Sequence, residues 1–337
     1  MTKVAFFEIE DWEEAQVRAA LPDAELFFYR RKLDETTPPP RLDFDAAVIF
    51  IDSRITLKTL DGFANLRFIA TRSTGYDHID LAACRARNVA VSYVPGYGDH
   101  TVAEFAFGLI LNLTRKIYCA IDQIKETGTF SLDGLRGADL KGKTIGIVGT
   151  GRIGREMVKI AKGFGMNVLA FDQYPNETFS STQGFSYATF EYLLRHSDIV
   201  SLHCPLTPQT RHLVNSGNIK FFKRGAYLIN TARGGLVETE ALVRALQEGV
   251  LAGAGLDVIE EEGETKDELG FLTKEPRPNR EDMKTMLENH ILMRMPNALV
   301  TPHLAFNSQE ALERILSTTI ENLKGFISGR PVNLVSQ

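Results

Sequence analysis

Three short segments carry side chains that could bind an organic acid and move a proton. They are NTARGG at residues 230–235, GLDVIEEE at 255–262 and TPHLAF at 301–306. The planar guanidinium of Arg233 can hold a carboxylate through two parallel hydrogen bonds. Histidine titrates near neutral pH, so His303 is the candidate proton donor to a carbonyl oxygen. Taken singly, each residue also fits an ordinary role, a surface ion pair for Arg233 and a satisfied buried or capping histidine for His303.

An acidic partner would orient the imidazole of His303 and favour its protonated form. Three glutamates follow GLDVI in succession, and Glu262 is one of them. On spacing alone, Glu260 and Glu261 are equal candidates for this role.

A glycine-rich segment, KTIGIVGTGRIGREMVKIAKGFGMNVLAFD at residues 143–172, predicts a dinucleotide site. Gly149 permits a tight turn after a strand, Gly151 lets the backbone approach a pyrophosphate, and Gly154 lets the next helix pack closely on the sheet. The N-terminus of that helix presents free N–H groups to the phosphates. Asp172 ends the second strand, where its carboxylate can bind ribose hydroxyls and repel a 2′-phosphate. The segment therefore favours NAD over NADP.

These segments need elements to position them, and apolar runs alternate with helical patterns along the whole chain. Expected strands are Val4–Glu8, Leu26–Tyr29, Ala46–Ile51, Arg67–Thr71, Val89–Tyr93, Thr144–Val148, Ile199–His203, Tyr227–Asn230 and Ala252–Asp257. The alternation predicts an α/β protein with two doubly wound parallel-sheet domains. We expect a Rossmann cofactor domain at residues 100–299, inserted in a flavodoxin-like substrate (catalytic) domain formed by residues 1–99 and 300–337.

Length and composition agree with this division. The chain has 337 residues, above the roughly 250–300 at which one core usually stops growing. A formal net charge of −5 predicts no nucleic-acid partner. Three widely spaced cysteines argue against a disulfide framework or a metal cluster and for a reducing compartment. Because no leader pattern and no apolar run of about 18 residues is present, we expect a cytoplasmic protein that has no membrane partner.

Two further stretches carry structural expectations. The stretch His100–Lys125 reads as one unusually long helix that connects the domains. The charge run EEEGETKDE at Glu260–Glu268 is typical of a solvated loop.

Several ordered motifs together resemble the NAD-dependent D-2-hydroxyacid dehydrogenase family over essentially the whole chain. They are TRSTGYDHIDLAA, VGTGRIG, SLHCPLTPQTRHL, INTARGG, GLDVIEEE and TPH. The resemblance implies a catalytic set of Arg233, Glu262 and His303, and so selects Glu262 over its two acidic neighbours. Formate dehydrogenases of the same superfamily carry glutamine at the acidic position, so the glutamate here speaks against that reaction.

Within the family the chain most resembles fermentative D-lactate dehydrogenases, because Tyr97 and Phe306 stand where that group has active-site aromatics. Both side chains could instead serve core packing. The resemblance implies that the backbone N–H groups of Ser73, Thr74 and Gly75 help to hold a substrate carboxylate. It also implies reduction of pyruvate to D-lactate by NADH, while glyoxylate, hydroxypyruvate, phenylpyruvate or branched keto acids remain open as substrates. The long charged segment from Gly263 to Asn297 resembles that group but carries no substrate information.

The resemblance also implies the remaining cofactor contacts and a partner. It implies that Arg152 and Ile153 contact the pyrophosphate and that Cys204 and Pro205 contact the adenosine. The residues implied to contact the nicotinamide are Thr231, Ala232, Arg233 and Asp257. The family is typically dimeric through its cofactor domains, so the His100–Lys125 stretch is the candidate interface of a homodimer. A different class with the same fold and the same three residues is the NAD-sensing corepressor of the C-terminal-binding-protein type. That alternative predicts a peptide-docking cleft and a disordered tail after the last helix.

Overall fold

The computed structural model describes residues 1–36, 38–266 and 279–335 and divides the chain into two compact units. Unit 1 comprises Met1–Tyr97 and Asn307–Gln337, and unit 2 comprises Gly98–Phe306. The breaks between the units thus follow residues 97 and 306, whereas the sequence placed them after residues 99 and 299. The segment that carries His303 therefore lies in unit 2.

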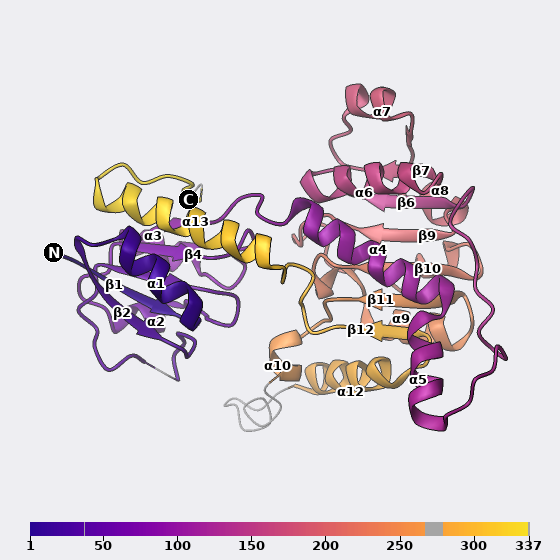
Figure 1. The fold of residues 1–337 in the computed structure, drawn as a ribbon, viewed down its shortest axis with the longest axis horizontal. Coiled ribbons are helices and arrows are strands. Elements are labelled where there is room, and N and C mark those ends of the chain that lie inside the picture. The colour runs from indigo at the N-terminus through magenta and orange to yellow at the C-terminus, as the bar shows by residue number, and fades with distance from the viewer. Residues whose placement is uncertain (37, 267–278, 336–337) are drawn as a thin grey trace. The chain divides into compact units, whose positions relative to one another are not determined.

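Unit 1 is a parallel sheet with strand order β2-β1-β3-β4-β5 and helices on both faces (Figure 1). Its strands are β1 (Thr2–Phe7), β2 (Ala24–Tyr29), β3 (Ala46–Ile49), β4 (Phe68–Thr71) and β5 (Ala90–Ser92). Its helices are α1 (Asp11–Ala20), α2 (Leu57–Asp61), α3 (Leu81–Ala86) and α13 (Gln309–Ile327). This strand order is that of flavodoxin-like folds, as expected.

Alternate side chains of the unit 1 strands enter separate cores on the two faces of the sheet. Phe6 joins a cluster with Val17 of α1 and Leu316 of α13. Its neighbour Phe7 joins another cluster with Leu60 of α2. Because both faces are covered, the strands read as continuous apolar runs.

Unit 2 is a seven-stranded parallel sheet with the order β12-β11-β10-β9-β6-β7-β8 (Figure 1). Its strands are β6 (Thr144–Val148), β7 (Asn167–Phe171), β8 (Ser186–Tyr187), β9 (Ile199–Leu202), β10 (Ala226–Asn230), β11 (Leu251–Leu256) and β12 (Ala298–Val300). Numbered from β6, the order is 7-6-5-4-1-2-3, which is the doubly wound Rossmann order with one added edge strand. The predicted fold class is confirmed.

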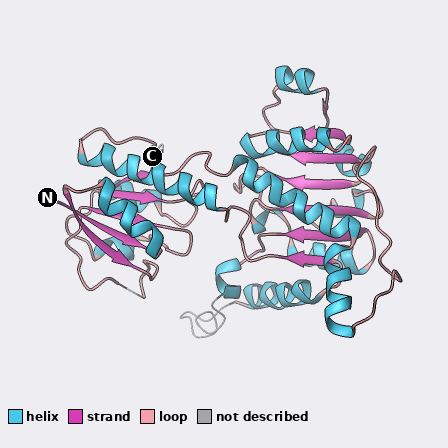
Figure 2. Ribbon diagram, viewed as in Figure 1, coloured by secondary structure: helices cyan, strands magenta, loops and turns pink. Residues whose placement is uncertain are grey.

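Helices cover both faces of the unit 2 sheet (Figure 2). The helices of unit 2 are α4 (Asp99–Arg115), α5 (Ile117–Thr127), α6 (Arg152–Gly163), α7 (Glu177–Gln183), α8 (Phe190–His196), α9 (Thr239–Gln247), α10 (Glu262–Lys266) and α12 (Arg280–Arg294). Leu109 and Leu113 of α4 pack against Gly255 of β11, where an added Cβ would lie 3.0 Å from the Leu109 Cβ. Among the described residues, no helix is both long enough and apolar enough to cross a bilayer.

The prediction of one helix over His100–Lys125 is wrong. The helix ends at Lys116, whose backbone is left-handed (φ 56°) and whose N–H donates to the Asn112 carbonyl. Beyond that point α5 begins, and none of its residues is buried. Lysine is a good helix former, so the sequence offers no local signal for this break.

Candidate active site

The candidate catalytic residues follow three neighbouring strands of unit 2. In the sheet register Asn230 of β10 pairs with Leu256 of β11, and Leu256 pairs with Val300 of β12. The segments that carry Arg233, Glu262 and His303 therefore leave the sheet at one edge. Ligands of open α/β sheets bind at this carboxyl edge.

His303 and Glu262 form a direct pair. The Nδ1 atom of the imidazole lies 3.1 Å and 3.2 Å from the two carboxylate oxygens of Glu262. Both side chains are about three-quarters buried, with 26% and 23% of their surfaces exposed. Because the carboxylate engages Nδ1, Nε2 is the ring nitrogen that can exchange a proton with another molecule. Of the three glutamates that the spacing left open, Glu262 has the contact.

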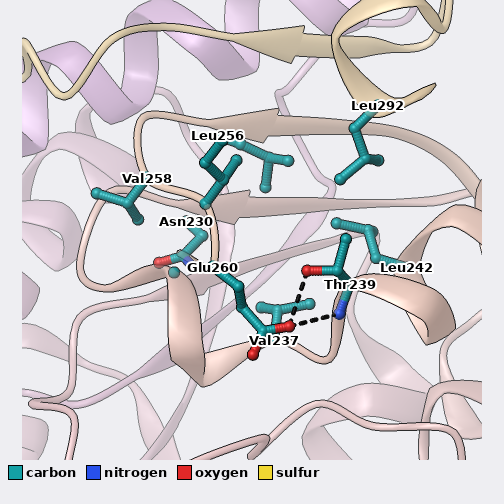
Figure 3. A pocket seen from close by; sticks show the side chains of 10 residues that line it. Asn230, Val237, Thr239, Leu242, Leu256, Val258, Glu260 and Leu292 are labelled. Carbon is teal, nitrogen blue, oxygen red and sulfur yellow. Dashed lines mark hydrogen bonds between the residues drawn. The ribbon is translucent and has the colours of Figure 1, made fainter. Parts of the chain in front are cut away.

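Glu260 has a different role, and for it the expectation of a solvated loop is wrong. Its side chain is 8% exposed and turned toward Thr239 inside a small pocket that Leu242 also lines (Figure 3). One carboxylate oxygen accepts hydrogen bonds from Thr239 N at 2.9 Å and Oγ1 at 2.8 Å. The other oxygen lies 2.6 Å from His212 Nε2. Glu260 thus fastens the segment before Glu262 to the start of α9.

Asp257 holds the loop that carries His303. Its carboxylate accepts hydrogen bonds from Thr301 Oγ1 at 2.6 Å, Leu304 N at 2.9 Å and Ala305 N at 2.8 Å. Its carbonyl accepts one from His303 N at 2.9 Å. Burial raises the pKa of Asp257, and these hydrogen bonds oppose that rise. His303 itself adopts a left-handed φ of 53°, which this bonding around it maintains.

The loop that carries Arg233 is held by its own first residue. Asn230 Nδ2 donates to the Arg233 carbonyl at 2.9 Å, and Asn230 Oδ1 accepts from Ala232 N at 3.1 Å. The loop also touches the Glu262 segment closely, because a Cβ added at Gly234 would lie 1.9 Å from the Ile259 carbonyl oxygen. Only glycine allows this crossing, which brings the two segments together.

Phe306 lies beside His303. Its ring stands edge-on to the His303 imidazole, with centroids 6.4 Å apart and an interplanar angle of 76°. The aromatic ring provides an apolar wall next to the histidine.

The candidate substrate residues of unit 1 lie on the loops after β4 and β5. Val94 N donates to the Ser73 carbonyl at 3.0 Å, and Thr74 Oγ1 donates to the Val94 carbonyl at 2.7 Å. Ser73 Oγ in turn donates to the Gly75 carbonyl at 2.6 Å. The Tyr97 carbonyl accepts a 2.6 Å hydrogen bond from Arg314 Nε of α13. These bonds order both loops, and the substrate-binding roles of the residues stay predictions.

A buried ion pair that sequence reasoning missed anchors the start of the first of these loops. Arg72 Nη1 lies 2.5 Å from Glu13 Oε1 of α1, and the two side chains are 3% and 4% exposed. The same guanidinium donates to the Glu8 carbonyl and lies over the Phe50 ring. Arg72 therefore links the end of β4 to α1 and to the end of β1.

The glycine-rich turn matches each expected glycine role. Gly149 has φ 92°, and a Cβ there would lie 2.8 Å from Cys204 N across the switch point between β6 and β9. A Cβ at Gly154 would lie 2.0 Å from the Gly149 carbonyl oxygen. A Cβ at Gly151, which caps the N-terminus of α6, meets nothing within 4 Å. The turn is therefore packed by two glycines and open at the third, so the residues present fit a bound pyrophosphate.

The neighbouring cofactor candidates are ordered around this turn. Asp172 Oδ2 accepts from Thr150 N at 2.6 Å and Oγ1 at 2.9 Å, which places the carboxylate directly beside the glycine turn. Arg152 Nε pairs with Asp99 Oδ2 at 2.9 Å. Ile153 follows Arg152 in the first turn of α6.

The adenosine candidates lie across the switch point. Burial raises the pKa of the Cys204 thiol to about 11, with a smaller contribution from the charge of Asp172, so the thiol stays neutral. The Pro205 carbonyl accepts a 2.7 Å hydrogen bond from Thr210 Oγ1, which orders the loop after β9. Thr231 Oγ1 is buried and has no hydrogen-bond partner among the described residues. Its hydroxyl is a group that a bound cofactor can use.

Sequence reasoning missed the residues that support the site. Asn230, Thr239 and Asn289 are buried polar residues, and each binds the backbone or side chain of a segment that carries a catalytic candidate. A polar residue at the end of an apolar strand, as at Asn230, could have been noticed. Nothing in the local sequence distinguishes Thr239 or Asn289 from a surface residue.

The glycine geometry predicts opposite effects of two alanine substitutions. Gly154→Ala should lower the free energy of unfolding by about 1–3 kcal/mol, because the new methyl group overlaps the Gly149 carbonyl. Gly151→Ala should leave stability nearly unchanged and weaken NADH binding about tenfold or more, because its methyl group points into the open side of the turn. Urea unfolding and calorimetric titration with NADH measure the two effects.

Gly163→Ala serves as the control, since its Cβ meets nothing within 4 Å near the end of the same helix. Full NADH affinity in Gly151→Ala would show that the pyrophosphate lies elsewhere.

Comparison with known proteins agrees with this geometry. The family model described as "D-isomer specific 2-hydroxyacid dehydrogenase, NAD binding domain" matches residues 107–305. The D-lactate dehydrogenase of Escherichia coli is 36% identical over 90% of this chain and 90% of its own length. The glyoxylate reductase of Thermofilum pendens is 39% identical over 88% of this chain and 82% of its own.

A solved structure shares the complete fold. The D-lactate dehydrogenase of Aquifex aeolicus, complexed with NAD and lactic acid, superposes with a TM-score of 0.84 at 33% identity, covering 99% of this chain and 100% of that one. The family match covers more than half of the chain, and the relatives exceed 30% identity over nearly all of it. This chain therefore belongs to the D-isomer-specific 2-hydroxyacid dehydrogenases, and it is an NAD-dependent oxidoreductase of that family.

Proposed function

We propose that this enzyme is a D-lactate dehydrogenase that reduces pyruvate to D-lactate with NADH. The observation that carries the proposal is the 3.1 Å pair of His303 and Glu262, which sits at the carboxyl edge of the sheet with Arg233 on a neighbouring strand end. The ring of Phe306 beside His303 supports a small substrate, because it offers an apolar surface for a methyl group.

The proposed mechanism gives each catalytic residue a separate role. Arg233 binds the substrate carboxylate through its guanidinium fork and so orients the keto group. His303, protonated, donates its Nε2 proton to the keto oxygen as negative charge develops there. Glu262 holds Nδ1 and stabilises the imidazolium before donation. In the reverse direction the neutral imidazole takes the hydroxyl proton.

We keep for the cofactor residues the roles that the glycine-rich segment and the family resemblance implied. Gly149, Gly151, Arg152, Ile153 and Gly154 hold the pyrophosphate, and Asp172 binds the ribose. Cys204 and Pro205 contact adenosine, and Thr231, Ala232, Arg233 and Asp257 border the nicotinamide. When bound, NADH supplies the hydrogen and the electron pair that reduce the keto carbon.

Ser73, Thr74, Gly75 and Tyr97 of unit 1 keep the substrate-binding roles that the family resemblance implied. The free cysteines support a reducing, cytoplasmic location, which we include in the proposal.

A second candidate substrate is glyoxylate, because the glyoxylate reductase of Thermofilum pendens is as similar to this chain as the D-lactate dehydrogenase of Escherichia coli is. Glyoxylate carries a hydrogen atom where pyruvate carries a methyl group. Contact between that methyl group and the wall formed by Phe306 is the interaction that favours pyruvate.

The enzyme should show its highest kcat/KM for pyruvate in a panel that includes glyoxylate, hydroxypyruvate, phenylpyruvate and a branched keto acid.

Arg233→Lys keeps the charge but loses the fork, so the KM for pyruvate should rise about 10- to 100-fold. The dissociation constant of NADH, measured by titration, should change little.

A higher kcat/KM for another acid of the panel would move the substrate assignment to that acid. An unchanged KM in Arg233→Lys would remove this residue from the carboxylate site. Lack of turnover with every acid, despite tight NADH binding, would favour a binding protein of the corepressor class.

The Glu262 pair predicts a pH effect of known sign. Reduction uses the protonated imidazole, and Glu262→Gln removes the negative charge that stabilises it. The rate of reduction should therefore begin to fall at a lower pH than in the parent enzyme. Oxidation of D-lactate uses the neutral imidazole, so this activity should persist to a lower pH. Full pH profiles in both directions measure the two shifts.

Glu261→Gln is the matched control, since Glu261 is exposed and the substitution removes the same charge one residue away. Glu260→Gln is unsuitable as a control because its carboxylate holds Thr239 and His212. Equal shifts of the pH profiles in the Glu262 and Glu261 variants would indicate a general effect of negative charge near His303 rather than a direct pair of Glu262 and His303.

We further propose a homodimer formed through α5. The apolar residues of this helix recur on one face and are exposed, with Ile117 42%, Ile121 47% and Ile124 46% accessible. Nearby Phe130 and Leu132 are 95% and 88% exposed. Exposed apolar surface of this kind commonly marks an interface.

Ile121→Glu should convert a dimer into a monomer in sedimentation equilibrium. Lys125→Gln changes the charge of the same helix by the same amount and should leave the dimer intact. A parent protein that sediments as a monomer would contradict the proposal.

A further inference from the structure

Asn289 is a buried polar residue in the segment Gly263–Asn297, to which the sequence assigned no role. It lies on α12 and is fully buried, at 0% exposure. The helix packs on the rest of unit 2 through the buried side chains of Met286 and Leu292, and Leu292 joins the core of that unit. Asn289 therefore projects from a firmly packed support.

The amide of Asn289 binds two groups on either side of Glu262. Its Nδ2 atom donates to the Glu260 carbonyl at 2.7 Å and to Thr265 Oγ1 at 3.1 Å. Both acceptors belong to the short stretch in which the chain turns into α10, and Glu262 is the first residue of that helix.

The turn that Asn289 spans is conformationally demanding. Glu261 adopts a left-handed φ of 49°, which a non-glycine residue rarely holds without support. The Glu261 carbonyl accepts hydrogen bonds from Thr265 N at 3.0 Å and Thr265 Oγ1 at 3.2 Å. Asn289 thus connects the residue before the turn to the residue that closes it.

The contacts of Asn289 indicate that its donor group is what matters. Within the described part of the chain its Oδ1 atom is buried and has no hydrogen-bond partner. An apolar side chain of similar size would avoid burying that oxygen, so packing alone does not explain an asparagine here.

We propose that Asn289 is a positioning residue for catalysis, which clamps the turn before α10 and so holds the Glu262 carboxylate against His303. This inference rests on the proposed function, because it assigns the effect of Asn289 to the proton donor. It also gives α12 a definite role within the segment Gly263–Asn297, since this helix carries Asn289; residues 267–278 of that segment lie outside the described part of the chain.

Other charges also face this region and must be kept constant in a test. The Glu260 carboxylate lies 2.6 Å from His212. Burial raises the pKa of Glu288 on α12, while Lys284 acts in the opposite direction. The substitutions at Asn289 and Thr265 therefore change no charge, so that any shift they cause in a pH profile reports the position of Glu262 and not the surrounding charges.

The experiment is a double-mutant cycle on the complete enzyme, using pH profiles of kcat for keto-acid reduction with saturating NADH. Asn289→Leu should lower kcat by about fivefold or more and move the falling limb to lower pH, the direction expected for Glu262→Gln. In the Glu262→Gln background, Asn289→Leu should change neither quantity. The KM for NADH should stay close to that of the parent in every variant.

If Asn289→Leu does not fold, a second pair of variants tests the contact between Asn289 and Thr265. Thr265→Val removes the hydroxyl that Asn289 binds and keeps the side-chain shape, so it should reproduce the shift in weaker form. Thr265→Ser keeps the hydroxyl and should behave like the parent enzyme.

The outcomes separate the two proposals. If the Glu262→Gln profile does not move, the proposed acid pair fails. If that profile moves while those of Asn289→Leu and Thr265→Val do not, the positioning role alone is wrong. Equal losses of kcat from Asn289→Leu with and without Glu262 would likewise overturn it, because they would show an effect that bypasses the acid.

Discussion

The buried carboxylate of Asp257 is the interaction on which the arrangement of the site depends. It stands at the end of β11, the central of the three strands that carry catalytic candidates, and it accepts hydrogen bonds from the loop that follows β12. A carboxylate with 1% exposure is costly unless its oxygens are satisfied, so the loop must close on it. Closing the loop places His303 in a left-handed conformation beside Glu262.

Around this carboxylate, the segments that carry the candidate catalytic residues are held by polar residues outside that candidate set. Asn230 holds the loop of Arg233, Glu260 fastens its own segment to α9, and Asn289 reaches the turn before Glu262. The glycine at position 234 lets two of these segments cross within a distance that no side chain would allow. A proton donor is effective only when its position is maintained, and two of these supports, Asn230 and Asn289, lie on β10 and α12.

Much of the fold could be predicted because its signals are local. Continuous apolar runs such as the strand before Gly149 indicate parallel strands covered on both faces. The spacing of the three glycines after that strand indicates a turn in which side chains would obstruct a close approach of the backbone. The break at Lys116 had no such signal, because the residue favours the helix that it ends. The burial of Glu260 was missed for a related reason. A run of charged residues indicates exposure to solvent, and the partner that allows Glu260 to be buried is distant in the sequence.

The sequence by itself determined the fold class, the dinucleotide turn and the residue types of the proposed chemistry, since each depends on neighbours within a few positions of the chain. Spacing left three consecutive glutamates open and the family resemblance selected Glu262, but only the tertiary structure supplied the physical reason for that choice. Glu260 and Glu262 differ in role because Thr239 and His212 engage one carboxylate while the left-handed turn at Glu261 directs the other toward the histidine. Spacing along the chain carries no information about such partners, because they lie 20 to 50 residues away and are brought together only when the strands assemble into the sheet.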